Sequence, residues 1–289
     1  NIPPVILFNA YASFEANLST VARIVLTLGF VLVFPRFGLV GPDWGLFALT
    51  VPVILEWLLS EVFARKYERC LEVGEGSSVA EQFRFTVPLS FGAGLLAVSP
   101  FMTAAFVGRA ADPSDMLAIH YVTLGIANPV SYAALRMQAV SIQFPPEWPG
   151  DRRLLRFAVV CGALLGIIPL VFSLPALGNW YYGTCQNIPP RILDTTRLVS
   201  FLYSFICIIH TVRGRVEGLA ALKKRPNAVM AGQFAYFFAL VLTLAVTLPT
   251  GMPGWGMSVL AIYVAPVAAT VITYVWLGGS PSRSLANGE

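Results

Sequence analysis

The sequence contains one short motif twice, first as Gly41-Pro42-Asp43-Trp44-Gly45 and again as Met252-Pro253-Gly254-Trp255-Gly256. Each copy lies between two long apolar runs. Aligning the two tryptophans gives an offset of 211 residues, and this offset pairs a whole hairpin, residues 21–59, with residues 232–270. Each tryptophan, taken alone, is also explained as an anchor at the membrane interface beside a turn, because tryptophan is enriched at that interface. The shared offset is too long for a solenoid period and indicates a duplicated helical bundle, an arrangement typical of transporters.

The composition identifies an integral membrane protein. Of the 289 residues, 56% are hydrophobic and 12% are charged, whereas soluble domains carry about 25% charged residues. The apolar runs have the length of membrane helices rather than barrel strands, so we expect an all-α fold. The net charge of +4 does not indicate nucleic-acid binding, because lysines and arginines in loops orient membrane proteins. The cysteines lack metal-ligand spacing, and no metal site is expected.

Eight apolar segments are long enough to cross about 30 Å of hydrocarbon. They cover residues 18–34, 45–63, 85–107, 115–143, 155–175, 191–211, 229–248 and 256–277. The second hairpin copy follows about four further spans, whereas the first copy has almost nothing before it. We therefore expect residues 1–75 to hold the last two helices of a truncated N-terminal bundle and residues 76–289 to form a six-helix C-terminal bundle.

Basic residues separate sharply between the two sides of these spans. Thirteen fall on one side and four on the other, which places the larger set in the cytoplasm. Both ends of the chain are then cytoplasmic, and the expected location is the cell membrane. The smaller set is Arg36, Arg109, Arg191 and Arg197, and the larger is Arg65, Lys66, Arg69, Arg84, Arg152, Arg153, Arg156, Arg213, Arg215, Lys223, Lys224, Arg225 and Arg283.

The fourth span carries the most polar face of the chain. At about 100° per residue, one side of this helix collects His120, Tyr121, Asn128, Ser131, Tyr132, Arg136, Gln138 and Gln143. Pro129 follows Asn128 and frees a backbone carbonyl in the middle of the span. Such a face lines a cavity, or it contacts another polar helix while Arg136 reaches the inner surface.

Three more charged positions inside spans are candidates for function, because a charge in hydrocarbon is costly. Glu56 is the deepest acid, and it is either a proton or cation coupling site or the ion-pair partner of a basic residue from the missing N-terminal spans. Arg197 follows Asp194 by three residues, a spacing that allows a local ion pair. Arg213 ends the sixth span, and its guanidinium suits phosphate or carboxylate groups.

Short strings along most of the chain match a known group. They are Thr211-Val212-Arg213 with Gly218-Leu219 and Leu222-Lys223-Lys224, then Phe106-Val107-Gly108-Arg109, and more loosely Pro129-Val130 with Gln138-Ala139-Val140. These strings resemble the progressive ankylosis (Ank) family of the multidrug/oligosaccharidyl-lipid/polysaccharide exporter superfamily. The family has serine where this chain has Gly108. The resemblance implies helices five to twelve of a twelve-helix, two-bundle MATE-like fold, and export of a small anion such as pyrophosphate, ATP or citrate.

The sequence therefore predicts a secondary transporter that exports a small organic or phosphorylated anion by alternating access. The candidate substrate-binding residues are Asn128, Arg136, Gln138, Arg197 and Arg213, with Glu56 as the coupling or ion-pair candidate. The alternatives are a lipid-linked oligosaccharide or multidrug exporter of the same superfamily, and a non-transporting membrane scaffold. An enzyme is not expected, for want of a catalytic constellation, and no cofactor is implied. The expected partners are the lipid bilayer and a small anion, not a nucleic acid.

Overall fold

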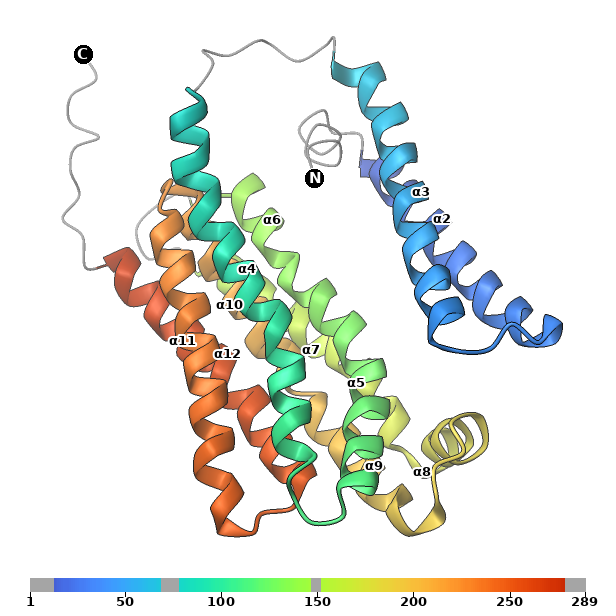
Figure 1. The fold of residues 1–289 in the computed structure, drawn as a ribbon. Coiled ribbons are helices and arrows are strands. Elements are labelled where there is room, and N and C mark those ends of the chain that lie inside the picture. Colours follow the sequence, from blue (N-terminus) through green and yellow to red (C-terminus); the bar gives the residue numbers. More distant parts are fainter. Residues whose placement is uncertain (1–12, 69–77, 147–151, 279–289) are drawn as a thin grey trace, which may run out of the picture. The chain divides into compact units, whose positions relative to one another are not determined.

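The computed structural model describes residues 13–68, 78–146 and 152–278, and all regular structure in these residues is helical (Figure 1). The chain divides into two compact units, residues 1–77 and 78–289. The all-α membrane fold expected from the composition is confirmed, because seven helices among the described residues are long and apolar enough to cross a membrane.

The first unit is a helical hairpin. Its helices are α2 (Ser13–Val33) and α3 (Pro42–Glu68), joined through the short 3-10 helix η1 (Phe34–Phe37). Gly38 closes η1 in the left-handed region, with φ of 71°, and donates its backbone N–H to the carbonyl groups of Phe34 and Pro35. Glycine takes this conformation without the steric cost that a Cβ brings. The ring of Trp44 packs edge-on against Phe34, with 5.6 Å between the ring centres, so the motif tryptophan supports the turn.

The second unit contains the remaining elements. In chain order they are α4 (Val79–Val107), α5 (Pro113–Leu135), α6 (Met137–Gln143), α7 (Arg153–Ser173), α8 (Pro175–Gly178), the π-helical η2 (Asn179–Cys185), α9 (Pro190–Tyr203), α10 (Ile206–Leu222), α11 (Pro226–Thr247), η3 (Leu248–Thr250) and α12 (Gly254–Gly278). The long helices form two groups. In one group α11 packs on α4 and α12, and in the other α10 packs on α5, α6 and α7. Contacts of α10 and α5 with α12 join the two groups.

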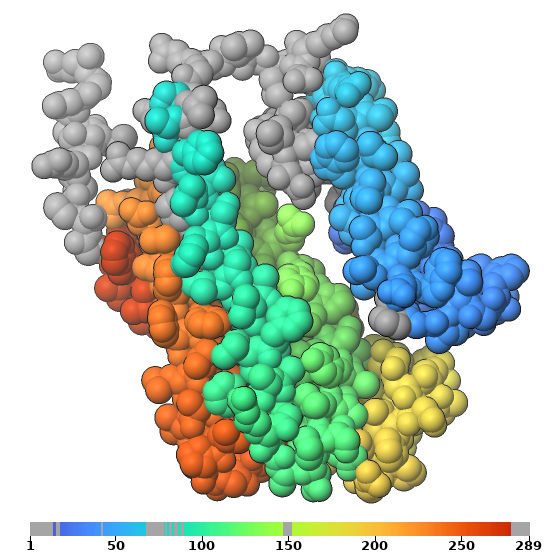
Figure 2. Space-filling model, in the orientation of Figure 1, coloured from blue at the N-terminus to red at the C-terminus, as the bar shows by residue number. Residues whose placement is uncertain are grey.

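Apolar side chains cover the outside of the second unit. Figure 2 shows α4 running along one face of this unit, and its exposed side chains include Phe91, Val98 and Phe101. In water such a surface would mark a binding or aggregation site. On helices of membrane length it is the surface that meets lipid chains.

Seven of the eight predicted spans are confirmed. The candidate membrane spans are Leu18–Phe37, Asp43–Tyr67, Ser90–Val107, Arg153–Ser173, Pro190–Leu222, Pro226–Thr250 and Gly254–Gly278. The prediction for residues 115–143 differs from the structure, because this segment forms two helices, α5 and α6, that meet at Arg136. The polar face that singled out this segment also lowers its hydropathy, so it does not reach the apolarity of the other seven.

The predicted span 191–211 is also interrupted. Helix α9 ends at Tyr203 and α10 begins at Ile206. The Ser204 hydroxyl donates to the carbonyl oxygen of Phe201 at 2.6 Å, a bond that competes with the regular helical pattern. The Tyr263 hydroxyl of α12 donates to the carbonyl oxygen of Leu202, which also accepts the backbone N–H of Phe205 at 3.4 Å, so α12 contacts the chain at this break. Both interrupted helices belong to the same half of the second unit.

Candidate functional site

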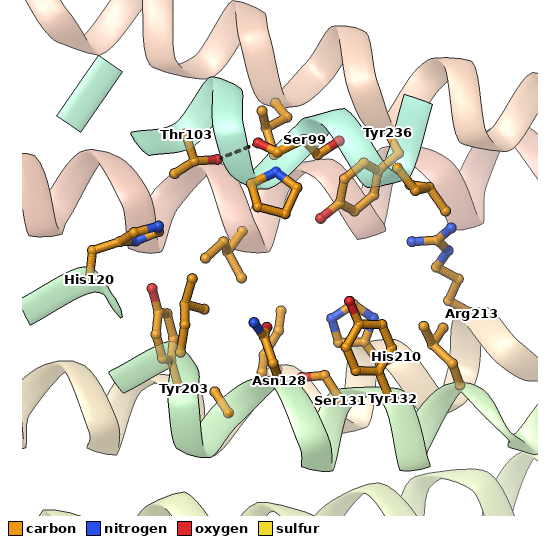
Figure 3. Close-up of a pocket in the computed structure, with 18 residues that line it drawn as sticks. Ser99, Thr103, His120, Asn128, Ser131, Tyr132, Tyr203, His210, Arg213 and Tyr236 are labelled. Carbon is orange, nitrogen blue, oxygen red and sulfur yellow. Dashed lines mark hydrogen bonds between the residues drawn. The ribbon is translucent and has the colours of Figure 1, made fainter. Parts of the chain in front are cut away.

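A cavity of about 130 Å³ lies between the two helix groups of the second unit (Figure 3). Its polar lining residues are Ser99 and Thr103 from α4, His120, Asn128, Ser131 and Tyr132 from α5, Tyr203 from α9, His210 and Arg213 from α10, and Tyr236 from α11. Liquid water occupies about 30 Å³ per molecule. The space therefore holds a few waters or one compact solute, among helices of membrane length.

Arg213 supplies a buried cation at one end of this cavity (Figure 3). Its side chain is only 3% exposed, and its Nε donates to Oε1 of Glu217 at 2.7 Å. The guanidinium also lies over the ring of Tyr236, 5.0 Å from the ring centre. A buried charge persists only when it is paired or otherwise compensated. Glu217 provides that compensation and fixes the direction in which the guanidinium points.

The terminal nitrogens of Arg213 remain for a ligand. Among the described residues, its hydrogen bond to Glu217 uses Nε alone. Tyr132 and Tyr236 line the same end of the cavity, and Asn128 lies between this end and the other (Figure 3). Guanidinium, phenol and amide groups are all hydrogen-bond donors. This end of the cavity is therefore suited to a group that accepts hydrogen bonds.

The opposite end of the cavity is organised by His120 (Figure 3). Its Nδ1 lies 2.7 Å from the Ser258 hydroxyl of α12, and the Tyr203 hydroxyl of α9 lies 3.2 Å from the same oxygen. This chain of hydrogen bonds joins three helices from both groups. The Nε2 atom of His120 is buried and has no hydrogen-bond partner among the described residues.

His210 is the second histidine of the cavity. It lies one helical turn before Arg213 on α10 and is 8% exposed. Its Nδ1 atom is buried without a hydrogen-bond partner in the described part of the chain. An unpaired buried polar atom costs free energy, so its presence beside a polar cavity points to a partner that binds there.

The structure brings two of the five predicted substrate residues together. Asn128 and Arg213 line the cavity from α5 and α10. Arg136 is exposed at the junction of α5 and α6 and does not line it. Gln138 is not among the lining residues either. Its backbone faces α10, where a Cβ added to Gly218 would approach the Gln138 carbonyl oxygen to 2.6 Å.

Arg197 lies away from the cavity and makes the local ion pair that its spacing predicts. Its Nη1 donates to Asp194 at 2.9 Å, and its Nε donates to the carbonyl oxygen of Ser173 at 3.2 Å. Its aliphatic part approaches the backbone of Gly178. These contacts hold α9 against the ends of α7 and α8, which is a structural role.

Glu56 belongs to the first unit, where it forms an ion pair. Its Oε2 accepts a hydrogen bond from Nη1 of Arg23 at 2.8 Å, and its Oε1 accepts one from the Thr20 hydroxyl at 2.7 Å. The described residues therefore show Glu56 in an ion pair, with Arg23 as its partner. Both partners of this pair come from within the α2–α3 hairpin.

Several lining residues carry no periodic signal in the sequence. Tyr236 lies in a largely apolar stretch and Tyr203 lies between Ser200 and Ser204, and neither tyrosine was a candidate. Ser99 and Thr103 are four residues apart on α4 and therefore share one face, but each bonds to a carbonyl oxygen of its own helix. The one sequence signal for Tyr236 and Tyr203 was a tyrosine within a span. Tyrosine is also enriched at membrane interfaces, so this signal did not indicate a cavity.

Comparisons with protein-family models, with curated proteins and with solved structures each find no match. Among the described residues, no group of three or more histidine, cysteine, aspartate or glutamate side chains could hold a metal ion. The site is therefore described by its own geometry. The chain is a multi-pass helical membrane protein with a polar cavity between the helices of its second unit.

Proposed function

We propose that the chain belongs to a secondary transporter that moves a small organic or phosphorylated anion across the cell membrane, with both ends of the chain in the cytoplasm. The observation that carries the proposal is Arg213, a buried arginine whose terminal nitrogens are unpaired among the described residues at an internal polar cavity. Charged residues inside a membrane bundle typically mark substrate or ion pathways. The resemblance to the Ank family supports the same class of substrate.

An anion suits the cavity better than a cation. Arg213 offers a planar fork of donors that matches carboxylate and phosphate oxygens, and Tyr132 and Tyr236 add hydroxyl donors at the same end. Among the described residues, the carboxylate paired with this arginine is that of Glu217. It accepts a hydrogen bond from Nε, which leaves the terminal nitrogens of Arg213 free for a ligand.

The size of the cavity favours a compact anion. Its volume of about 130 Å³ is below the roughly 300–1,000 Å³ of typical ligand pockets. Pyrophosphate and citrate are therefore better candidates than ATP in this conformation. A lipid-linked oligosaccharide would require a far larger opening, and a scaffold would not require an arginine directed into a cavity.

Transport by the full chain in proteoliposomes tests the proposal. The probes are radiolabelled pyrophosphate, citrate and ATP. Arg213→Gln should lower the flux of the transported anion by about ten- to a hundredfold, because a hydrogen bond to a charged group contributes about 1.5–3 kcal/mol. Arg156→Gln is the matched control, since Arg156 is exposed at the start of α7 and should transport like wild type.

Two results would contradict the proposal. One is flux no higher than that of empty liposomes for all three probes. The other is equal flux in the wild type and in Arg213→Gln, with both proteins inserted to the same extent. Arg213→Lys refines the assignment: it keeps the charge but loses the planar fork, so its flux should fall between those of the wild type and Arg213→Gln.

A further inference from the structure

The charges that face the cavity already balance without a ligand. Arg213 and Glu217 form a buried pair at 2.7 Å, with side chains 3% and 10% exposed. Together they contribute no net charge. An anion that binds to Arg213 therefore leaves its full negative charge uncompensated in a low-dielectric interior, where an unpaired charge is costly. A further positive charge must accompany it.

The side chains around His210 do not supply that charge. The ionisable groups at this depth on the elements packed around it are Cys207, Arg213 and Glu217 on α10, Tyr132 on α5, Tyr203 on α9, Tyr236 on α11, Tyr263 on α12 and Cys161 on α7. Helix α6 contains no ionisable residue. Tyrosine and cysteine are neutral near pH 7 in their ordinary states. His210 is the group beside Arg213 that can gain a positive charge there.

We propose that the anion enters this cavity together with one proton, which is carried on Nδ1 of His210. This inference rests on the proposed anion site. His210 shares the Arg213 end of the cavity (Figure 3), and its Nδ1 is one of two buried imidazole nitrogens at the cavity that lack a partner among the described residues; the other, Nε2 of His120, lies at the far end. An anion held by Arg213 stabilises a protonated imidazole one turn away by opposite charge.

The proton balance of the step is simple. The lone pair of Nδ1 takes a proton from water on the side to which the cavity opens, as the anion binds to Arg213. On the other side the anion leaves, the imidazolium returns the proton to water, and the Arg213–Glu217 pair is unchanged. Anion and proton therefore move in the same direction, with one fewer negative charge transferred than for the anion alone.

His120 is the other histidine that lines the cavity, and its position suits this role less well than that of His210. It is also buried and lines the same cavity. Its Nδ1 is already engaged by Ser258 at 2.7 Å, and it lies at the end of the cavity opposite Arg213 (Figure 3). A proton on His120 would therefore compensate an anion at Arg213 less well, because the attraction falls with distance.

Isothermal titration calorimetry of the purified full chain with citrate tests the inference. The titration is done at about pH 7.5, where carboxylates are ionised and an unperturbed histidine is mostly neutral. The measured enthalpy is compared between buffers of different ionisation enthalpy, and the slope gives the protons taken up per citrate bound. We expect a slope of about one for wild type and for the exposed control Arg156→Gln, and about zero for His210→Gln.

The outcomes separate this inference from the proposed function. If wild type does not bind citrate, pyrophosphate or ATP, the anion site itself fails. If wild type binds citrate with a slope near zero, or if His210→Gln keeps the wild-type slope, the site stands and the proton on His210 is refuted. If His210→Gln does not bind at all, the pH dependence of citrate binding by wild type and by Arg156→Gln decides. Their affinity should then fall by up to about tenfold per pH unit as the pH rises, and a flat profile overturns the inference.

Discussion

The two hairpins that carry the repeated motif share a turn but differ in how their helices are joined. In each, a short 3-10 helix is followed by a glycine in the left-handed region, Gly38 with φ of 71° and Gly251 with φ of 74°. In each, the next helix begins within two residues of the motif tryptophan. The repeated motif thus corresponds to a repeated local geometry.

The interfaces inside the hairpins are of different kinds. The α2–α3 hairpin is joined by polar contacts, including the Arg23–Glu56 pair and the Ser19–Ser60 hydrogen bond at 3.0 Å. The α11–α12 hairpin is joined by close approach of backbones, and its buried cluster is apolar: Leu240, Leu244, Met257, Ala261 and Ala265. The two hairpins therefore share their turn geometry but not their interface, because the turn and the interface depend on different side chains.

The largest expected effect comes from breaking the polar interface. Glu56→Leu leaves Arg23 unpaired inside a membrane span, which costs about 2.5–3.5 kcal/mol on insertion scales. The fraction of full chain with a correctly inserted first hairpin, read by glycosylation tags in a cell-free membrane assay, should fall severalfold. Val267→Leu, at the aligned position of the second hairpin, should have no effect. If the double variant Arg23→Leu/Glu56→Leu inserts as poorly as the single one, the ion pair is not what the hairpin needs.

A smaller effect is expected from overpacking the second interface. A Cβ at Gly232 would lie 2.0 Å from Oγ1 of Thr273 and 3.0 Å from the Ala269 carbonyl oxygen. Gly232→Leu should therefore lower the stability of the detergent-solubilised chain by about 1–3 kcal/mol, seen as a lower thermal midpoint. The aligned residue is Val21, which is exposed on α2. Val21→Leu should stay within about 0.5 kcal/mol of wild type, and similar losses in both variants would contradict the difference between the hairpins.

The smallest effect tests what the hairpins have in common. No atom lies within 4 Å of a Cβ built on Gly38 or Gly251, so alanine at either position meets backbone strain alone. The cost of the left-handed conformation is about 1–2 kcal/mol. Gly38→Ala and Gly251→Ala should shift the unfolding midpoint of their own unit by comparable amounts. A clear loss in one and none in the other would show that the two turns are not equivalent.

The sequence predicts the helices of this protein better than it predicts its site. Apolar runs of membrane length and the repeated motif were sufficient for the fold class and for seven spans. Asn128 was found because a regular helix phase holds from His120 to Tyr132. Gln138 was misplaced relative to the cavity because it follows the interruption at Arg136, and a helical wheel loses its phase across a break. Arg136 still follows the phase of α5, but it lies about 80° from Asn128, at the edge of the polar face.

The other discrepancies also have physical causes. The spacing of Asp194 and Arg197 correctly predicts their ion pair, but spacing cannot show that this pair lies away from the cavity. Tyr236 lies against Arg213 across two helices, a contact set by tertiary packing that leaves no pattern along the chain. Long-range pairs of this kind are what the three-dimensional structure adds.

Equilibrium binding of radiolabelled pyrophosphate to the purified full chain tests the central claim most directly, that Arg213 rather than Arg136 or Arg197 holds the anion. Arg213→Gln should weaken binding by at least about tenfold. Arg136→Gln and Arg197→Gln should bind like wild type, provided that their thermal midpoints show them to be folded. Unchanged binding in Arg213→Gln, together with loss in Arg136→Gln or Arg197→Gln, would contradict the account and place the site outside this cavity.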